Sequence, residues 1–216
     1  MVTTVAASSP SADRQVISLA IDRGLVCLRG LSPQRLRFEL EYALERGSTA
    51  NSFLFEAGLD ATGVQQPSVL VHPPGMAYSS VFLPALQDAL PATDEPLLIV
   101  VGHVNPNRVA LLQELAGTYP GLELIASNPG AKLLQELWNR RKPSPSGVED
   151  EAQALPDFPP LRVIRREQTL ELSHGRSLLL IPAPTPRWPG GLMAFEERFG
   201  LLMSDKFFSA HLCTSD

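Results

Sequence analysis

The chain has 216 residues, which at the usual ~150 residues per domain favours one domain over an assembly of several. Its composition is 44% hydrophobic and 19% charged, so it can form a packed core, and disorder of the whole chain is excluded. The formal net charge of −5 argues against nucleic acid or an anionic membrane as the main partner, because both require clustered positive charge.

Cysteine usage and hydropathy indicate the compartment. Cys27 and Cys213 lie far apart and form no C-x-x-C pair, which excludes a disulfide framework and favours a reducing compartment. Residues 1–14 lack the basic and apolar regions of a secretory signal, and no apolar run approaches the ~18 residues that span a bilayer. We therefore expect a cytoplasmic protein without membrane insertion.

The first third of the sequence predicts a short tail followed by strands. Residues 1–15 are small and polar, so we expect a disordered tail there and one domain over residues 16–216. Apolar stretches separated by turn residues then predict β-strands, the first two of which form a hairpin. These predicted strands cover residues 16–21, 25–28, 36–42, 52–57 and 69–72.

The middle of the chain alternates helices with buried strands. The segment 96–102 is apolar on both faces, which is typical of a buried strand, and a helix with an apolar stripe follows it. Predicted helices cover residues 80–89, 107–117 and 130–140, and predicted strands cover residues 96–102 and 122–126. This order favours parallel pairing within an α/β layered fold.

A proline-rich and acidic segment interrupts this pattern at residues 142–160, where we expect a flexible, exposed insertion within the domain. The remaining sequence returns to short predicted strands, at residues 161–164, 169–172, 177–181, 192–195 and 201–204. Strand-rich flanks around a central α/β region favour an αββα sandwich, in which two mixed sheets pack face to face with helices outside.

Polar residues follow the buried strand 96–102. His103, Asn105 and Asn107 alternate along an extended segment, so their side chains are expected to project the same way. In layered α/β folds ligands gather beyond the carboxyl ends of strands, which makes this segment a candidate metal site. The alternative is that Asn107 caps the following helix and that His103 is a hydrogen-bonded histidine under the loop. Both interpretations stand at this point.

Two later segments carry further candidates. A proline-stiffened loop at residues 182–191 contains Arg187 and Trp188, and its simplest interpretation is a rigid crossover in which Trp188 fills a gap. Asp205 follows the apolar strand 201–204, a position where an aspartate serves as often as a turn residue as it does as a ligand.

Six motifs, taken in order, resemble one protein family. They are RLRFELEYALERGSTAN at 35–51, HPPG at 72–75, GHVNPNR at 102–108, SNP at 127–129, PAPTPRWPG at 182–190 and SDKFFSAHLC at 204–213. Together they resemble the metallo-β-lactamase-like domain of flavodiiron proteins, and more narrowly the diflavin flavoproteins of cyanobacteria and related phototrophs. The resemblance implies a metallo-β-lactamase-like αββα sandwich that is incomplete at its C-terminus.

The resemblance also implies a reaction and an assembly. Members of the family pass electrons from NAD(P)H or a photosynthetic donor through flavin to oxygen, which is reduced to water at a non-haem di-iron site in this domain. The FMN lies in a flavodoxin-like domain, and this chain ends at Asp216, before such a segment. Subunits pair head to tail, so the resemblance implies a homodimer, or a heterodimer with a flavodiiron-type sister subunit.

Departures from the family pattern imply a degenerate metal site. His103 and Asp205 match two ligand positions of the family. Asn105 and Asn107, in contrast, stand where the family has Glu and Asp, and Arg187 stands at a ligand histidine. The last ligand histidine would lie beyond residue 216.

These exchanges make the local charge unfavourable to paired iron. Two carboxylates are lost and one guanidinium is gained, and Arg108, which replaces a residue that is often histidine, adds a further positive charge. Each unit of charge is worth on the order of 4 kcal/mol at ~4 Å and an effective dielectric constant of ~20. We therefore expect the iron pair to be absent or weakly bound. In its place we expect a salt bridge from Asp205 to Arg187 or Arg108, and a pocket that attracts an anion such as chloride.

Three functions are compatible with these residues and this resemblance. The first is the oxygen-reducing domain of a diflavin flavodiiron-type protein, here with a degenerate site and without a flavin domain, so that the chain alone is inactive. The second is a non-catalytic module for heteromer assembly. The third is a metal-dependent hydrolase of the metallo-β-lactamase class, against which stands the missing His-x-His-x-Asp-His zinc signature.

Overall fold

The computed structural model describes residues 14–34, 37–38, 42–43, 47–90, 96–139, 156–208 and 212–214. The predicted tail over residues 1–15 and the predicted insertion over residues 142–160 lie mostly outside these ranges. Gln15, at the end of the predicted tail, already belongs to the first strand.

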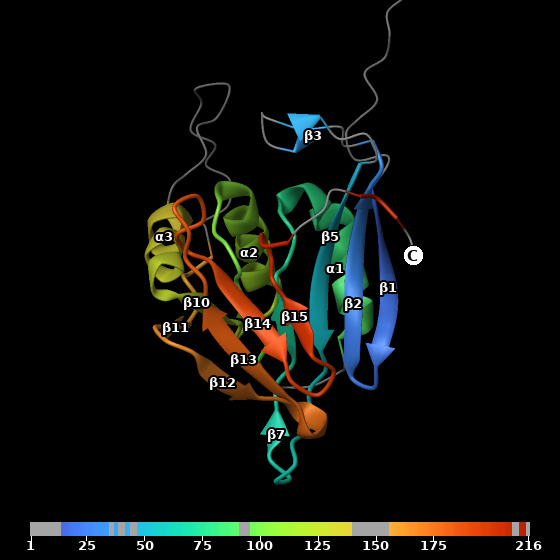
Figure 1. Cartoon of the computed structure of the whole chain (residues 1–216), viewed down its shortest axis with the longest axis vertical. Coiled ribbons are helices and arrows are strands. Elements are labelled where there is room, and N and C mark those ends of the chain that lie inside the picture. The colour runs from blue at the N-terminus through green and yellow to red at the C-terminus, as the bar shows by residue number, and fades with distance from the viewer. Residues whose placement is uncertain are drawn as a thin grey trace, which may run out of the picture.

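A seven-stranded mixed sheet forms the larger layer, with strand order β1-β2-β5-β8-β9-β10-β11 (Figure 1). Its strands are β1 (Gln15–Asp22), β2 (Leu25–Ser32), β5 (Ser48–Phe55), β8 (Val69–Val71), β9 (Leu98–Val100), β10 (Glu123–Ser127) and β11 (Leu161–Ile164). The first four pair antiparallel, and β8 to β11 pair parallel. A tight turn at Arg23 and Gly24 joins the antiparallel pair β1 and β2, whereas a helix lies between each two successive parallel strands from β8 to β11, as crossover connections require. The predicted hairpin and parallel pairing are both confirmed.

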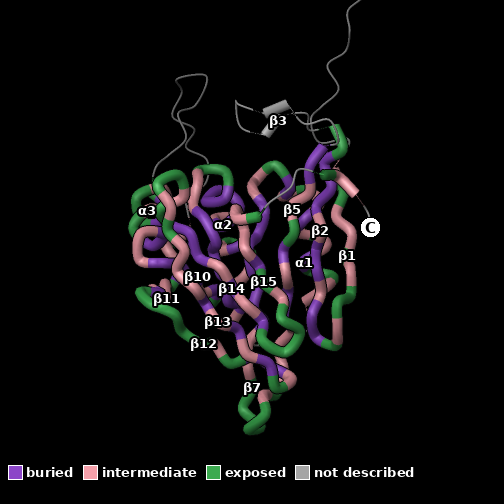
Figure 2. The backbone as a smooth tube through the Cα atoms, in the orientation of Figure 1, coloured by how far each residue is buried: buried purple, intermediate pink, exposed green. Residues whose placement is uncertain are grey.

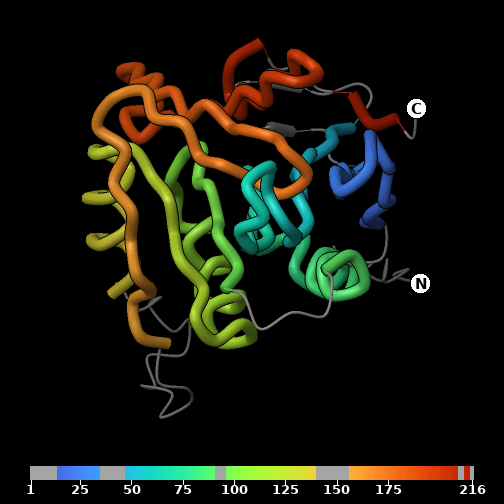
Figure 3. Tube along the Cα trace, turned by 90° about the horizontal axis from the view of Figure 1, so that it is seen from below, coloured from blue at the N-terminus to red at the C-terminus, as the bar shows by residue number. Residues whose placement is uncertain are grey.

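A smaller antiparallel sheet packs face to face on the larger one. It consists of β12 (Gln168–Glu171), β13 (Ser177–Pro182), β14 (Leu192–Glu196) and β15 (Leu201–Met203), in that order. Alternate residues such as Leu178 and Leu180 of β13 point into a shared apolar layer, where they meet Val71 and Val100 of the larger sheet. Figure 3 shows the orange and red strands of this smaller sheet on one side of the larger sheet.

Three helices cover the opposite face of the larger sheet. They are α1 (Ser79–Ala89), α2 (Pro106–Thr118) and α3 (Asn128–Trp138), accompanied by short 3-10 turns η1 (Met76–Tyr78) and η2 (Ser173–Gly175). Their buried side chains, such as Leu111 and Leu134, form a second apolar cluster with the sheet. The buried residues follow these layers through the molecule (Figure 2). The two packed sheets confirm the predicted α/β sandwich, and within the described ranges helices cover only the larger sheet.

One predicted strand is wrong in its form. The period-two pattern over residues 36–42 predicts a single strand, whereas the structure has two short strands there, β3 (Arg37–Phe38) and β4 (Tyr42–Ala43), paired antiparallel. Alternation of apolar and charged residues does not distinguish one long strand from two strands that pair with each other. The small pair β6 (Gly58–Leu59) and β7 (Gln65–Gln66) carries too few residues for such a pattern.

Candidate functional site

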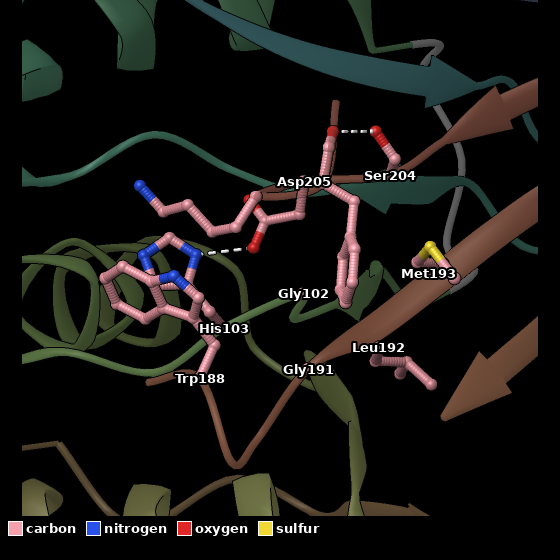
Figure 4. Close-up of a pocket in the computed structure, with 10 residues that line it drawn as sticks. Gly102, His103, Trp188, Gly191, Leu192, Met193, Ser204 and Asp205 are labelled. Atoms are coloured by element: carbon pink, nitrogen blue, oxygen red, sulfur yellow. Dashed lines mark hydrogen bonds and ion pairs between the residues drawn. The ribbon is translucent and has the colours of Figure 1, made fainter. Parts of the chain in front are cut away.

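The candidate site forms where chain segments leave strands of both sheets. Gly102 and His103 follow β9, Asp205 follows β15, and the proline-rich loop before β14 brings Trp188 (Figure 4). Gly102 is required here, because a Cβ atom at this position would lie 2.7 Å from the His72 ring and 2.8 Å from Cβ of Asp205. The absence of a side chain at Gly102 therefore allows this segment to approach His72 and Asp205 closely.

His103 lies at the centre of the site, and both of its ring nitrogens have partners. Nδ1 of His103 is 2.5 Å from Oδ2 of Asp205 (Figure 4). On the other side of the ring, Nδ2 of Asn105 is 3.0 Å from Nε2 of His103. The carboxylate only accepts and the amide nitrogen only donates, so the proton of the neutral imidazole is on Nδ1 and Nε2 is an acceptor. This arrangement leaves neither ring nitrogen available to a metal ion.

Asn105 is oriented by the helix that follows it. It is the N-cap of α2, and its Oδ1 accepts a hydrogen bond of 2.8 Å from the backbone nitrogen of Arg108. Since Oδ1 faces the helix, Nδ2 faces His103. The cap therefore couples the start of α2 to the tautomer of His103.

Arg108 projects from the first turn of α2 into the site and is only 8% exposed. Its Nη1 and Nη2 lie 3.3 and 3.4 Å from Oδ1 of Asp205. Nη1 also donates to the backbone oxygen of His103 at 3.2 Å and lies 2.8 Å from Nδ1 of that residue. The salt bridge from Asp205 to Arg108 that was predicted as one of two alternatives is thus present.

Burial and charge set the protonation states of these groups. Burial, together with the Arg108 guanidinium, lowers the pKa of His103 to about 4, so its imidazole is neutral near pH 7. Burial alone would raise the pKa of the Asp205 carboxyl, but the Arg108 guanidinium and the hydrogen bond from His103 outweigh burial and hold that pKa well below its usual range. The site therefore contains one guanidinium and one carboxylate around a neutral imidazole.

Trp188 packs against the imidazole from the proline-rich loop. Its ring lies edge-on to His103, with 4.9 Å between the centroids, and Nζ of Lys206 lies 5.0 Å from the Trp188 ring. The loop is held in place by Ser127, whose Oγ donates to the backbone oxygen of Gly190 at 2.9 Å. Trp188 is therefore a part of the site wall, beyond the gap-filling role that its loop predicts.

Two of the predicted site residues lie away from this cluster. Asn107 is exposed on the first turn of α2, and Arg187 is exposed with its guanidinium carbon 5.9 Å from the Trp188 ring. The predicted convergence of His103, Asn105 and Asn107 is wrong because α2 begins at Pro106. The extended alternation ends there, and Asn105 instead of Asn107 becomes the cap. Among the ion pairs of the described residues, Asp205 is paired with Arg108 and not with Arg187.

His72 is a buried residue behind the site that the sequence identifies only as the end of a strand. Its backbone φ is 57°, its Nε2 donates to the backbone oxygen of Leu192 at 3.0 Å, and its own backbone oxygen accepts from Ser52 Oγ. Burial lowers the pKa of His72, which keeps the ring neutral. This histidine fixes the start of β14 against the end of β8, and the motif HPPG alone does not reveal that contact.

The residues of this site do not fit a pair of iron ions. His103 uses both nitrogens, Asp205 is neutralised by Arg108, and Asn105 supplies an amide already bonded at both ends. Over the ranges that the structure describes, no three His, Cys, Asp or Glu side chains gather where they could hold a metal ion. Paired iron is instead held in proteins by several carboxylates and imidazoles that are free to coordinate.

None of the described helices combines the length and the apolar character that crossing a membrane would require.

The chain resembles known proteins in both sequence and structure. No family model matches the chain. Diflavin flavoprotein A 6 of Nostoc sp. (strain PCC 7120 / SAG 25.82 / UTEX 2576) is 38% identical over 205 residues, which cover 95% of this chain and 32% of that protein. The chain thus spans about a third of the length of the curated relatives it matches.

Two solved structures have the same fold as this chain and are more than 30% identical to it in sequence. The metal-soaked Flv1 flavodiiron core from Synechocystis sp. PCC6803 matches with a TM-score of 0.76 and 32% identity, over 94% of this chain and 45% of that one. A crystal structure of diflavin flavoprotein A 5 (fragment 1–254) from Nostoc sp. PCC 7120 matches with a TM-score of 0.75 and 31% identity, over 96% of this chain and 71% of that one. The predicted metallo-β-lactamase-like fold is therefore confirmed, and this chain belongs to the diflavin flavoprotein family, in the region of its flavodiiron core.

Proposed function

We propose that this chain is the core domain of an oxygen-reducing flavodiiron-type assembly, and that an internal ion network replaces the iron pair in its own pocket. The observation that carries the proposal is the buried guanidinium of Arg108 against Asp205 and His103. Under this proposal the chain does not reduce oxygen by itself. It acts as a subunit beside a sister subunit that has a complete set of iron ligands.

Electrostatics support the absence of paired iron from this pocket. A fixed guanidinium repels a metal cation placed beside Asp205 by on the order of 4 kcal/mol per unit charge at ~4 Å and an effective dielectric constant of ~20. The amide of Asn105 supplies no negative charge to compensate that repulsion. Asn107 and Arg187, which are exposed, supply no carboxylate either.

The other parts of the proposed reaction belong to segments that this chain does not match. The chain spans about a third of its curated relatives, and we assign FMN binding and electron entry to the remaining length of such proteins. In the proposed assembly a core with bound iron reduces oxygen, and this chain contributes its surface to a homo- or heterodimer arranged head to tail. The cytoplasmic location predicted from the low cysteine content is part of the same proposal.

The first test measures metal content. The purified chain is incubated with ferrous iron without oxygen, freed of loosely bound metal and assayed for iron and protein. We expect well below one iron per chain, and two equivalents per chain would overturn the proposal. A diflavin core with all of its iron ligands, treated in the same way, is the positive control.

The second test measures assembly and activity. The chain is mixed with a ligand-complete diflavin flavoprotein, and the complex is sized by analytical ultracentrifugation while oxygen consumption is recorded. We expect a heteromer whose oxygen consumption requires the ligand-complete subunit. Oxygen consumption by this chain with reduced flavin and without that subunit would contradict the proposed role.

A further inference from the structure

The two sheets differ in how their outer faces are covered. Helices α1 to α3 cover the outer face of the larger sheet, whereas no described helix or strand crosses the outer face of the smaller sheet, which is turned toward the viewer in Figure 1. We infer that this face is a docking site for one amphipathic helix, carried by the part of the flavodiiron core that the relatives have beyond their match to this chain. The inference does not depend on the metal content of the pocket.

The strands of the smaller sheet are apolar on both faces. In β13, Leu178 and Leu180 are buried against the larger sheet, so the residues that alternate with them point outward. Five apolar residues form this outer patch, and none of them belongs to either apolar cluster of the described residues: Leu179, Ile181, Met193, Phe195 and Leu202. An antiparallel sheet with one face in water alternates apolar and polar residues, so this pattern indicates a sheet that is covered on both faces.

Pairing between the strands makes the outer patch continuous and gives it a polar border. Leu179 lies opposite Phe195, which in turn lies opposite Leu202 on the next strand. On the other side, Leu179 lies opposite Thr169 of β12, which is exposed, as is Glu171 of the same strand. An exposed apolar patch with a polar rim marks an interaction surface. The outer patch therefore spans β13, β14 and β15 and ends at β12.

The size of the outer patch fits one helix and not a second copy of this chain. The row from Leu179 through Phe195 to Leu202 crosses two spacings between strands, about 10 Å, which is the width of one helix with its side chains. Along β13, from Leu179 to Ile181, the outer patch extends over about 7 Å. A stable dimer buries ~800 Å² on each partner, much more than a patch of this extent offers.

The relatives have polypeptide from which such a helix can come. The match to the crystal structure of diflavin flavoprotein A 5 (fragment 1–254) covers 96% of this chain but 71% of that one, so more than a quarter of that core lies outside the match. A helix with an apolar stripe on one side and polar residues on the other suits a face that separates a sheet from water. With this helix in place, both sheets would have a helical cover, as an αββα sandwich requires.

The test is an NMR titration of this chain, labelled at the methyl groups of leucine, isoleucine and methionine, with peptides that tile the unmatched part of that fragment. We expect one peptide to bind as a helix and to shift the methyl signals of Leu179, Ile181 and Met193. Leu179→Thr should weaken its binding by about tenfold or more, because a large apolar contact is lost. Leu59→Thr is the matched control, on an exposed leucine of β6, and should leave the affinity unchanged.

Three outcomes would overturn the inference. The first is that no peptide binds, and the second is that Leu179→Thr and Leu59→Thr weaken binding equally. The third is a concentration-dependent dimer of the chain without peptide that shifts the same methyl signals, because the occupant is then a second copy. If Leu179→Thr does not fold, Leu202→Thr replaces it in the titration, since Leu202 is 41% exposed. Unfolding of both variants also overturns the inference, because outward side chains contribute little to stability.

Discussion

The guanidinium of Arg108 and the carboxylate of Asp205 form a buried ion pair, with 3.3 Å between Nη1 and Oδ1. The two residues are 97 positions apart in the sequence, on the first turn of α2 and just beyond β15. Their meeting ties the helical layer to the smaller sheet across the edge of the larger one.

Removing one partner of the pair should destabilise the fold more than removing both. Asp205→Asn leaves a buried guanidinium without a counter-charge, and we expect a loss of about 3–5 kcal/mol in the free energy of unfolding. Arg108→Met in the same chain should recover much of that loss, because no uncompensated charge remains. Denaturant unfolding of the single and double variants measures the coupling. Additive losses would contradict the pairing, and exposed Arg187→Met should change stability by less than about 0.5 kcal/mol.

Acid should destabilise the protein in two stages. The folded pKa of His103 is about 4, below the ordinary histidine value of ~6.5, so the unfolded chain binds the proton first as the pH falls. The stability contributed by the neutral imidazole is fully present above pH ~6.5 and is lost as the pH falls towards ~4, by roughly 3 kcal/mol. The lowered pKa of Asp205 adds a further loss below pH ~4. Urea unfolding at several pH values should give a smaller slope between pH ~6.5 and ~4 for His103→Gln. A slope in His103→Gln equal to that of the unmodified chain would refute the assignment to His103. The pH dependence that remains in this variant is due to other buried groups such as His72, whose pKa is also lowered.

Gly102 should tolerate no side chain. In Gly102→Ala the new Cβ would meet the His72 ring at 2.7 Å and Asp205 Cβ at 2.8 Å, and we expect a loss of about 1–3 kcal/mol in unfolding free energy. Gly117 in α2 is a matched control, because a Cβ atom there meets nothing within 4 Å. Gly117→Ala should leave stability unchanged or raise it by about 0.5–1 kcal/mol. Equal effects of the two substitutions would argue against the close approach described here.

Asn105 should act on both the helix and the imidazole. Asn105→Ala removes the cap of α2, which should cost about 1 kcal/mol. Asn105→Asp keeps the acceptor for the Arg108 backbone nitrogen but replaces the amide that donates to Nε2 of His103 with a carboxylate. We therefore expect a raised pKa of His103 in Asn105→Asp, measured by NMR titration of the imidazole. Asn107→Ala, on the exposed side of the same turn, should change neither quantity.

Features of this protein that depend on neighbouring residues can be predicted from the sequence, whereas contacts between residues far apart in the sequence cannot. The apolar pattern of neighbouring residues predicts the buried strand around Ile99 and the hairpin at Gly24, and the structure contains both. Family resemblance and charge predict that Asp205 pairs with an arginine. Which arginine it is depends on the start of a helix, and a one-residue difference there turns Asn107 outward and Arg108 inward. The contact of His72 with Leu192 spans 120 residues and has no local signal at all.

Because α2 starts at Pro106, the pocket is sensitive to insertions and deletions that arise in this loop during evolution. Successive residues of a helix point about 100° apart, so a single insertion or deletion between His103 and Arg108 would swing the guanidinium away from Asp205. The number of residues in this short loop therefore determines whether a charged side chain enters the pocket, even when the amino acids that line the pocket are unchanged. Relatives with a different spacing here would present another side chain to the same carboxylate.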